Sequence, residues 1–207
     1  VTGPLGFDVL SDGTPVAKPD LTGESVSVSG NTLSGAKIDL SVYDYLGIPI
    51  PQGTVTASAI SAGGVDVSEL SVAFSRQAAE TAGVEASARM NGVPLALAGD
   101  ATFRPNEIVV ALQRLTAAIP DAAVALQDPA RIRIAGGTTT LSDLTLTVGE
   151  GRLSASGSAG ETLDLSADLT NVPAAVANPF VENLSLAGTI DGTAEVSGQA
   201  SDPAARF

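Results

Sequence analysis

The segment from Thr138 to Ala200 alternates apolar and polar residues, and this pattern constrains the fold more than any other feature of the chain. Its apolar members are Leu141, Leu144, Leu146, Val148, Leu153, Ala155, Leu163, Leu165, Ala167, Leu169, Leu184, Leu186, Ile190, Ala194 and Val196. Because successive side chains of a β-strand point to opposite sides, apolar residues two apart share one face. The pattern therefore predicts four or five short strands with one apolar and one polar surface.

Glycine-centred turns are predicted to join these strands. They are placed at Gly149-Glu150-Gly151, at Ala159-Gly160-Glu161 and at Asp191-Gly192, since glycine adopts the backbone conformations that tight turns require. We expect a sheet in which the leucines lie on one surface and the serines and threonines on the other.

The same alternation runs through the first half of the chain. The first twenty-odd residues hold Pro4, Pro15 and Pro19 and are expected to form an edge or an irregular connector. Strands are then expected at residues 26–28, 36–42, 55–59 and 65–74, with turns at Gly30-Asn31 and Gly63-Gly64. Residues 46–51 contain Pro49 and Pro51, which argue against an interior strand and predict a loop or bulge.

Two heptapeptides nearly repeat one design. Residues 66–72 read DVSELSV and residues 140–146 read TLSDLTL, and the alternation slips by one residue in both. A β-bulge at Ser68-Glu69 and at Ser142-Asp143 would return the apolar side chains to the same face. Each copy is followed by a turn, an Ala- and Ser-rich strand, and a strand that ends near a Val-Pro pair, Val93-Pro94 or Val172-Pro173. We therefore expect one elongated β domain over residues 1–207, made of stacked repeats near 53–100 and 138–200.

Two segments fit more than one structure. In residues 107–119 the apolar positions Ile108, Ala111, Leu112, Leu115 and Ile119 follow a helical stripe that Pro105-Asn106 would begin. They also fit a strand from Ile108 to Leu112, and the β pattern on both sides favours the strand. Residues 174–178 lie between two prolines and are expected to hold at most one helical turn.

The composition excludes several classes of function. The formal net charge is −13, with only 10 Lys plus Arg, which argues against a nucleic-acid partner and against docking on an anionic membrane surface. The chain has no Cys and no His, so disulfides, thiol chemistry, most zinc sites and the usual general base are absent. Aromatic residues make up 3% of the chain, so the apolar face is aliphatic, unlike the ring-filled core of most compact sandwiches.

No catalytic pattern is found in the sequence. A Gly-x-Ser-x-Gly elbow is missing, and neither lysine has the spacing of a Ser-Lys pair. Asp164 and Asp168 are four apart on a predicted strand, and the neighbouring serines indicate a solvated face instead of a glycosidase carboxylate pair. Gly63-Gly64 and Gly136-Gly137 lack the calcium repeat and the phosphate-loop lysine. We therefore expect neither an enzyme nor a cofactor or metal.

The aliphatic face is the candidate functional site. Its floor is predicted to consist of Ile38, Leu40, Val42, Val67, Leu70, Val72, Leu144, Leu146, Leu153, Leu163, Leu165 and Leu169. An acyl chain of ~16 carbons moving through water exposes methylenes at roughly 0.8 kcal/mol each, on the order of 12 kcal/mol in all. A continuous aliphatic groove removes most of that cost, so the face suits phospholipid acyl chains as a partner.

Three other interpretations of this face are open. The aliphatic residues also fit an ordinary sandwich whose two halves close on each other. A sheet edge, or the same groove, would suit a chaperone that holds an unfolded outer-membrane strand by β-augmentation. A surface adhesin would share the Ser, Thr and Gly content, with ligand patches over a filled interior. The cross-section of the sheet, open or closed, distinguishes these interpretations.

Both ends of the sequence suggest a piece of a longer protein. The chain begins at Val1 without a Met, and Phe207 follows Asp202-Pro203 in what looks like the start of another unit. No stretch approaches the ~20 apolar residues needed to cross a bilayer, so we expect this piece to be soluble.

Several segments resemble the recurring unit of the TamB family. That unit reads leucine-Gly-x-hydrophobic-x-Gly-x-Ala-x-hydrophobic-x-Gly and is followed by a proline. Residues 184–198, LSLAGTIDGTAEVSG, followed by Asp202-Pro203, are similar to it, as are residues 144–157 and 163–173. Residues 128–132, DPARI, fit the family's lead-in. The resemblance is clearest from about Gln127 to Arg206.

This resemblance implies a periplasmic part of an AsmA-like protein that an N-terminal helix anchors in the inner membrane of a Gram-negative cell. The fold it implies is an elongated, U-shaped β-sheet (a β-taco, similar to an open β-solenoid) with an apolar inner groove. The family is linked to phospholipid movement between the two membranes and, with a TamA-type barrel related to BamA, to outer-membrane protein assembly. The segments that insert in the inner membrane or contact the barrel match no residues of this chain.

Overall fold

The computed structural model describes residues 1–28, 31–62, 65–120, 122–180 and 185–207, and its regular structure is almost entirely β. Fifteen strands and one short 3₁₀ helix cover the described residues, which confirms the predicted all-β class. The chain divides into two compact units, Val1–Pro105 (unit 1) and Asn106–Phe207 (unit 2), and each is described by itself.

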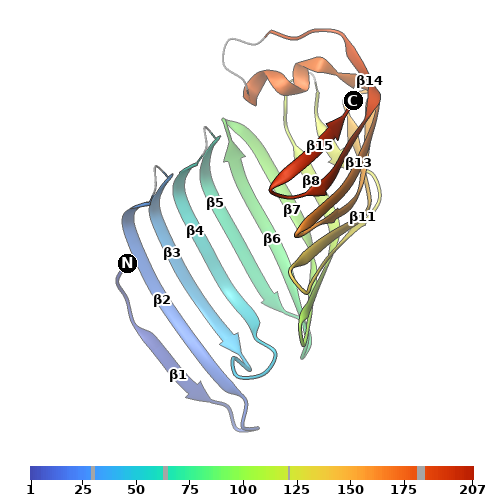
Figure 1. The fold of residues 1–207 in the computed structure, drawn as a ribbon. Coiled ribbons are helices and arrows are strands. Elements are labelled where there is room, and N and C mark those ends of the chain that lie inside the picture. The colour runs from blue at the N-terminus through green and yellow to red at the C-terminus, as the bar shows by residue number, and fades with distance from the viewer. Residues whose placement is uncertain (29–30, 63–64, 121, 181–184) are drawn as a thin grey trace. The chain divides into compact units, whose positions relative to one another are not determined.

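Unit 1 is an antiparallel sheet in which every strand pairs with the next one along the chain (Figure 1). Its strands are β1 (Leu5–Val9), β2 (Pro15–Val28), β3 (Asn31–Tyr43), β4 (Ile50–Ala62), β5 (Val65–Arg76), β6 (Thr81–Met90) and β7 (Val93–Arg104). The hairpin between β6 and β7 turns at Asn91 and Gly92, whose φ angles are 47° and 81°. Two successive positive φ angles match the twist of antiparallel strands, and Asn-Gly is the residue pair that adopts them most readily.

Unit 2 is also antiparallel. Its strands are β8 (Glu107–Ala117), β9 (Val124–Leu126), β10 (Ala130–Ala135), β11 (Thr138–Val148), β12 (Gly151–Ala159), β13 (Thr162–Pro173), β14 (Thr189–Gln199) and β15 (Asp202–Arg206). They follow the order β8-β10-β11-β12-β13-β14-β15. The short strand β9 pairs with the ends of β8 and β11, where Val124 lies opposite both Ala117 and Val148. The 3₁₀ helix η1 (Ala174–Phe180) continues directly from β13.

Both predicted bulges are present. The register between β5 and β6 shifts between Ser68 and Ser71, and that between β11 and β12 shifts between Leu141 and Leu144. The extra residues, Glu69 and Asp143, have positive φ angles of 53° and 58°. A residue in this conformation turns the strand and restores the alternation beyond it.

Several other predictions are confirmed. Residues 107–117 form strand β8, as the surrounding pattern favoured. The turns at Gly149-Glu150 and Gly160-Glu161 separate β11 from β12 and β12 from β13. The turns predicted at Gly30 and at Gly63-Gly64 lie outside the described residues.

Three predictions about local structure are wrong, and two are confirmed only in part. Asp191-Gly192 is no turn, because both residues lie inside β14, where Gly192 pairs with Leu169 and Asp191 lies at a shift in the register with β13, and Leu186 precedes that strand. The N-terminal segment was expected to be an edge or an irregular connector, and among the described residues β1 is an edge strand of the sheet. From Pro15 onward, however, the segment belongs to the regular strand β2, since its prolines lie where no backbone donor is needed by a neighbour. The loop predicted at residues 46–51 is present from 46 to 49, between β3 and β4, but Pro51 lies inside β4, one residue after its start. Val93-Pro94 begins β7 where a strand end was expected. The helix after Pro173 spans seven residues, more than one turn of a 3₁₀ helix.

Candidate functional site

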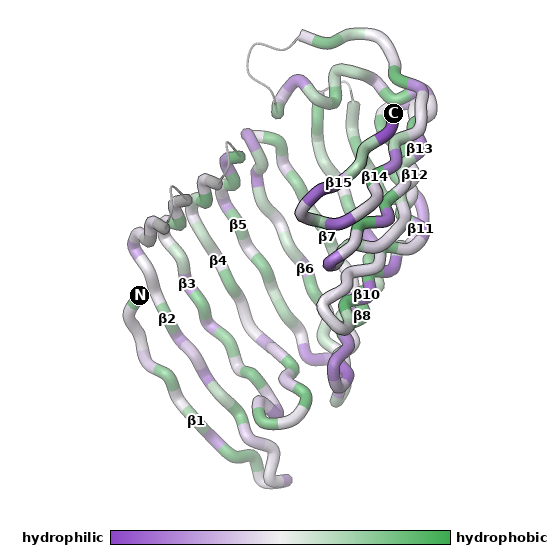
Figure 2. Tube along the Cα trace, in the orientation of Figure 1, coloured by the Kyte–Doolittle hydropathy of each residue, from purple (hydrophilic) through white to green (hydrophobic). Residues whose placement is uncertain are grey.

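One face of unit 1 carries an unbroken aliphatic row across six strands. Successive members lie opposite one another in register from β2 to β7: Leu21, Ile38, Val55, Val72, Ala86 and Leu97. Paired residues of an antiparallel sheet place their side chains on the same face. Figure 2 shows the alternation that produces this row, with hydrophobic and hydrophilic positions following each other along the strands.

Unit 2 carries a comparable row across seven strands. It runs through Val110, Ile132, Leu141, Gly157, Leu165, Val196 and Ala205. A second row, nearer the end of the strands, runs from Leu126 through Leu146 and Leu153 to Leu169. We name the surface that contains these rows the apolar face of each unit.

All twelve residues predicted for the groove floor are half-buried, and none is fully covered. Ile38, Leu40, Val42, Val67, Leu70 and Val72 belong to unit 1, and Leu144, Leu146, Leu153, Leu163, Leu165 and Leu169 to unit 2. Ile38 and Val72 lie in the aliphatic row of unit 1, and Leu165 in that of unit 2. A sealed sandwich would bury such side chains almost completely, so within each unit this surface remains partly open.

Few apolar side chains are fully buried in either unit. In unit 1 they are Val16, Ile50, Ala57, Ala82, Val93 and Ala101, with Val16 and Ile50 only 1% exposed. In unit 2 they are Leu112, Ala117, Ile119, Ala122, Ala130, Val148, Val172 and Ala174. Val16 and Ile50 both pair with Tyr43, five positions from Ile38 in β3, so they lie on the face opposite the aliphatic row. None of the twelve predicted floor residues is among the fully buried ones.

Sequence reasoning missed several members of these rows. Leu21 lies in a proline-containing segment, in which the sequence did not predict a regular strand. Leu97 lies beyond Val93-Pro94, where the sequence predicted that a strand would end. Ile132 sits between two arginines in the short strand β10. Their period-two spacing within each strand was a usable signal, but the proline and charged neighbours weakened it.

Glycines opposite leucines allow the strands to approach closely at the apolar face. A Cβ atom on Gly157, which pairs with Leu165, would lie 2.0 Å from the carbonyl oxygen of Asp164. Gly53, which pairs with Leu40, has the same relation to Asp39 at 2.1 Å. The φ angles of Gly157 and Gly53 are 134° and 128°, values that other residues rarely adopt. Glycine is therefore required at both positions.

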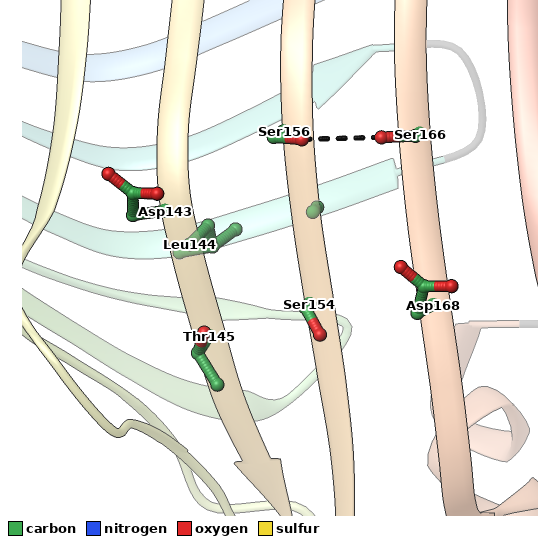
Figure 3. Close-up of a pocket in the computed structure, with 8 residues that line it drawn as sticks. Asp143, Leu144, Thr145, Ser154, Ser156, Ser166 and Asp168 are labelled. Carbon is green, nitrogen blue, oxygen red and sulfur yellow. Dashed lines mark hydrogen bonds between the residues drawn. The ribbon is translucent and has the colours of Figure 1, made fainter.

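The opposite face of unit 2 is polar. An open hollow of about 220 Å³ is lined by Asp143, Thr145, Ser154, Ser156, Ser166 and Asp168, together with Leu144 and Ala155. Ser156 and Ser166 are hydrogen-bonded at 3.2 Å across β12 and β13 (Figure 3). Asp164 and Asp168 are exposed and lie opposite serines of β12, as expected for a solvated face. The hollow offers hydroxyl groups and two carboxylates to solvent.

Charged side chains remain at the surface in ion pairs. Lys18 and Asp8 are 2.7 Å apart, and Arg89 and Glu69 are 3.1 Å apart. The hydrogen bond and charge of Lys18 lower the pKa of Asp8, and Asp8 in turn raises the pKa of Lys18. Among the described residues no polar or charged side chain is buried, so no unpaired charge interrupts the aliphatic rows from within.

The described residues contain no group of three or more His, Cys, Asp or Glu that would hold a metal ion. In the same part of the chain, no helix is long and apolar enough to cross a membrane.

Comparison with known proteins identifies a family. Residues 15–191 match the family described as "Uncharacterized protein conserved in bacteria (DUF2125)". No curated protein and no solved structure matches the chain. The matched residues run from the start of β2 into β14 and include both bulged hairpins. The chain therefore belongs to the DUF2125 family of bacterial proteins.

Proposed function

We propose that the apolar faces bind the hydrocarbon chains of phospholipids, and that the chain is the periplasmic part of an inner-membrane-anchored bridge that carries phospholipid between the inner and outer membranes. The observation that carries this proposal is that all twelve floor residues are only half-buried. Aliphatic side chains that a fold leaves partly exposed in continuous rows are available to an aliphatic ligand.

The energetics favour a hydrocarbon ligand over a polar one. Each methylene that leaves water for an apolar surface gains roughly 0.8 kcal/mol. A row of six aliphatic positions on adjacent strands extends for about 24 Å, since strands lie ~4.8 Å apart. That length is comparable to an extended acyl chain, so one row has enough surface to shield most of a lipid tail.

The resemblance to the TamB family supports the transport part of this proposal. The segments that carry it include residues 144–157 and 163–173, which form the β11–β13 part of the apolar face in unit 2. A carrier of this kind needs no catalytic group, since the lipid is moved without chemical change. The negative charge of the protein favours hydration of the polar face of the sheet.

Site-specific photo-crosslinking in cells tests the proposal. A photoreactive residue at Leu165, on the apolar face, is expected to capture phospholipid. The matched control is the next residue, Ser166, which lies on the polar face of the same strand and is expected to capture none. Absence of lipid at Leu165, or equal capture at both positions, would contradict lipid binding by this face.

Native mass spectrometry of the purified chain gives an independent readout. Co-purified phospholipid that is lost in a Leu165→Glu variant and retained in a Ser166→Glu variant is the expected result. Both substitutions add one carboxylate to the same strand, so the two variants differ only in the face of the sheet that carries the new charge. Retention of lipid in both variants would contradict lipid binding by the apolar face at Leu165.

A second candidate function has one observation in its favour. Strand β1 has an exposed edge with Leu5, Phe7 and Val9 56%, 62% and 69% exposed, and such edges accept further strands. A chaperone for outer-membrane protein assembly, acting with a TamA-type barrel, would use this feature. It predicts that photoreactive residues at Phe7 capture unfolded outer-membrane protein and that residues at Leu165 do not capture lipid.

A further inference from the structure

Arg76 occupies the point where the apolar face of unit 1 reaches solvent. It is the last residue of β5 and follows Val72 and Phe74 at intervals of two residues. Residues two apart in a strand share one face, so β5 carries an aliphatic, an aromatic and a cationic position in that order toward its end. Val72 belongs to the aliphatic row, Phe74 is half-buried and Arg76 is exposed. A phospholipid has the same order of apolar and charged groups, from its acyl chain to its headgroup.

Arg76 differs in position from the other basic residues of unit 1, which are Lys18, Lys37, Arg89 and Arg104. Each of these lies an odd number of residues from the member of the aliphatic row in its own strand, namely Leu21, Ile38, Ala86 or Leu97. They therefore occupy the opposite face of the sheet. Within the described residues of unit 1, Arg76 is the only basic residue at a position of the apolar face.

The guanidinium group of Arg76 is positioned by an aromatic ring. Its Cζ atom lies 4.6 Å from the centroid of the Tyr43 ring, and Tyr43 is the last residue of β3. A guanidinium stacked on a ring keeps its N–H groups free for planar contacts with an anion. Lys18, Lys37 and Arg89 are paired with carboxylates, whereas Arg76 forms no ion pair with any residue that the structure describes.

The carboxylate of Asp12 lies within the electrostatic influence of Arg76 but is held by its own turn. Hydrogen bonds from Thr14 lower the pKa of Asp12, and the positive charge of Arg76 lowers it further. The amide of Thr14 donates to Oδ1 of Asp12 at 2.9 Å. The guanidinium of Arg76 therefore remains available to an anion from outside the chain.

We propose that Arg76 binds the phosphate group of a phospholipid whose acyl chain lies on the apolar face of unit 1. This assignment rests on the proposed function and adds the orientation of the lipid, with the headgroup at the end of β5. Arginine donates paired hydrogen bonds to phosphate. Four residues of an antiparallel strand span about 13 Å, so the first part of the lipid would lie along Phe74 and the acyl chain would reach the row at Val72. A phosphate placed within the row would lose its hydration without a cationic partner.

Two lipids with identical tails test this assignment. The probes are short-chain phosphatidylethanolamine and the corresponding diacylglycerol, which lacks the phosphate, and calorimetric titration of the purified chain measures both affinities. Arg76→Gln is expected to weaken the binding of phosphatidylethanolamine about tenfold and to leave that of diacylglycerol unchanged. The matched control is Arg89→Gln, which removes the same charge from the opposite face and is expected to change neither affinity.

Salt gives a second readout that a merely structural role of Arg76 would not change. Added salt is expected to weaken the binding of phosphatidylethanolamine to the natural chain, because it screens an exposed ion pair. The same salt is expected to have no effect on Arg76→Gln. A salt dependence that is equal in the natural chain and in Arg76→Gln would overturn the assignment.

The outcomes separate this assignment from the proposed function. An unchanged affinity of Arg76→Gln for phosphatidylethanolamine, or an equal loss for diacylglycerol, would overturn the headgroup contact and leave acyl-chain binding in place. If the natural chain bound neither lipid, both would fail. Inorganic phosphate is expected not to displace the lipid at equal concentration, because it lacks the tail. Displacement would identify a site for free phosphate and overturn the assignment.

Discussion

Glu69 and Asp143 adopt the same left-handed backbone conformation at the same point of two hairpins, with φ angles of 53° and 58°. Each follows a serine and precedes a leucine, and each is the extra residue of a bulge in the register with the next strand. Leu70 and Leu144 thereby return to the apolar face. Glu69 is paired with Arg89 at 3.1 Å, while Asp143 borders the polar hollow.

A β-branched residue at position 143 is expected to destabilise the bulge. Asp143→Val should lower the free energy of unfolding by about 1–2 kcal/mol, because a left-handed conformation brings a branched Cβ against the backbone. Asp164→Val is the control, since it removes an exposed carboxylate from a regular part of the same face. Chemical denaturation measures both, and equal losses would contradict a conformational cost at Asp143.

Close strand approach makes Gly157 irreplaceable. Gly157→Ala should cost more than about 2 kcal/mol of stability, because its Cβ would meet the carbonyl oxygen of Asp164 at 2.0 Å. Gly192→Ala is the matched control, as a Cβ there meets nothing within 4 Å. The control should change stability by less than about 1 kcal/mol. A neutral Gly157→Ala in thermal unfolding would argue against the close approach.

The partly open apolar face predicts unequal costs for truncating aliphatic residues. Ile50→Ala should cost about 2–5 kcal/mol, because Ile50 is 1% exposed. Leu165→Ala should cost less than about 2 kcal/mol, since its half-buried side chain loses fewer contacts. Urea denaturation compares the two variants. If Leu165→Ala cost as much as Ile50→Ala, the face would be sealed in solution.

The ion pair between Asp8 and Lys18 predicts a pH dependence at β1. The pKa of Asp8 is lowered from its ordinary 3.8, so its contribution to stability is present above that pH and is lost as the pH falls through the lowered value. The pKa of Lys18 is raised from 10.5, so its contribution is present below pH 10.5 and is lost as the pH rises through the raised value.

A variant isolates this ion pair from the other titrating groups. The difference in melting temperature between the natural chain and Asp8→Asn should be constant near neutral pH and shrink both in acid and in strong base. Asp12→Asn, whose carboxyl pKa is lowered by hydrogen bonds from Thr14, should lose its effect in acid only. A difference for Asp8→Asn that persists at pH 2 would show that the pair contributes nothing.

The local sequence pattern was sufficient to predict structure where the direction of a side chain depends only on its own strand. The alternation in residues 141–169 predicted the leucines of β11, β12 and β13, and the slips at Glu69 and Asp143 predicted both bulges. The local pattern was insufficient where residues typical of turns lie within a strand. Asp191 and Gly192 have a turn-like sequence, yet β13 pairs across them, and Asp191 accepts a hydrogen bond from the amide of Asn171 at 2.8 Å.

By itself the sequence determined that this protein is built from strands with one aliphatic and one polar face, because side-chain direction in a strand depends only on position along the chain. Tertiary structure alone decided which aliphatic residues are sealed and which are not. Ile50 and Leu165 are both aliphatic residues of alternating strands, but Ile50 is 1% exposed and Leu165 is only half-buried. Burial depends on what lies opposite a side chain in space, and periodicity carries no information about that.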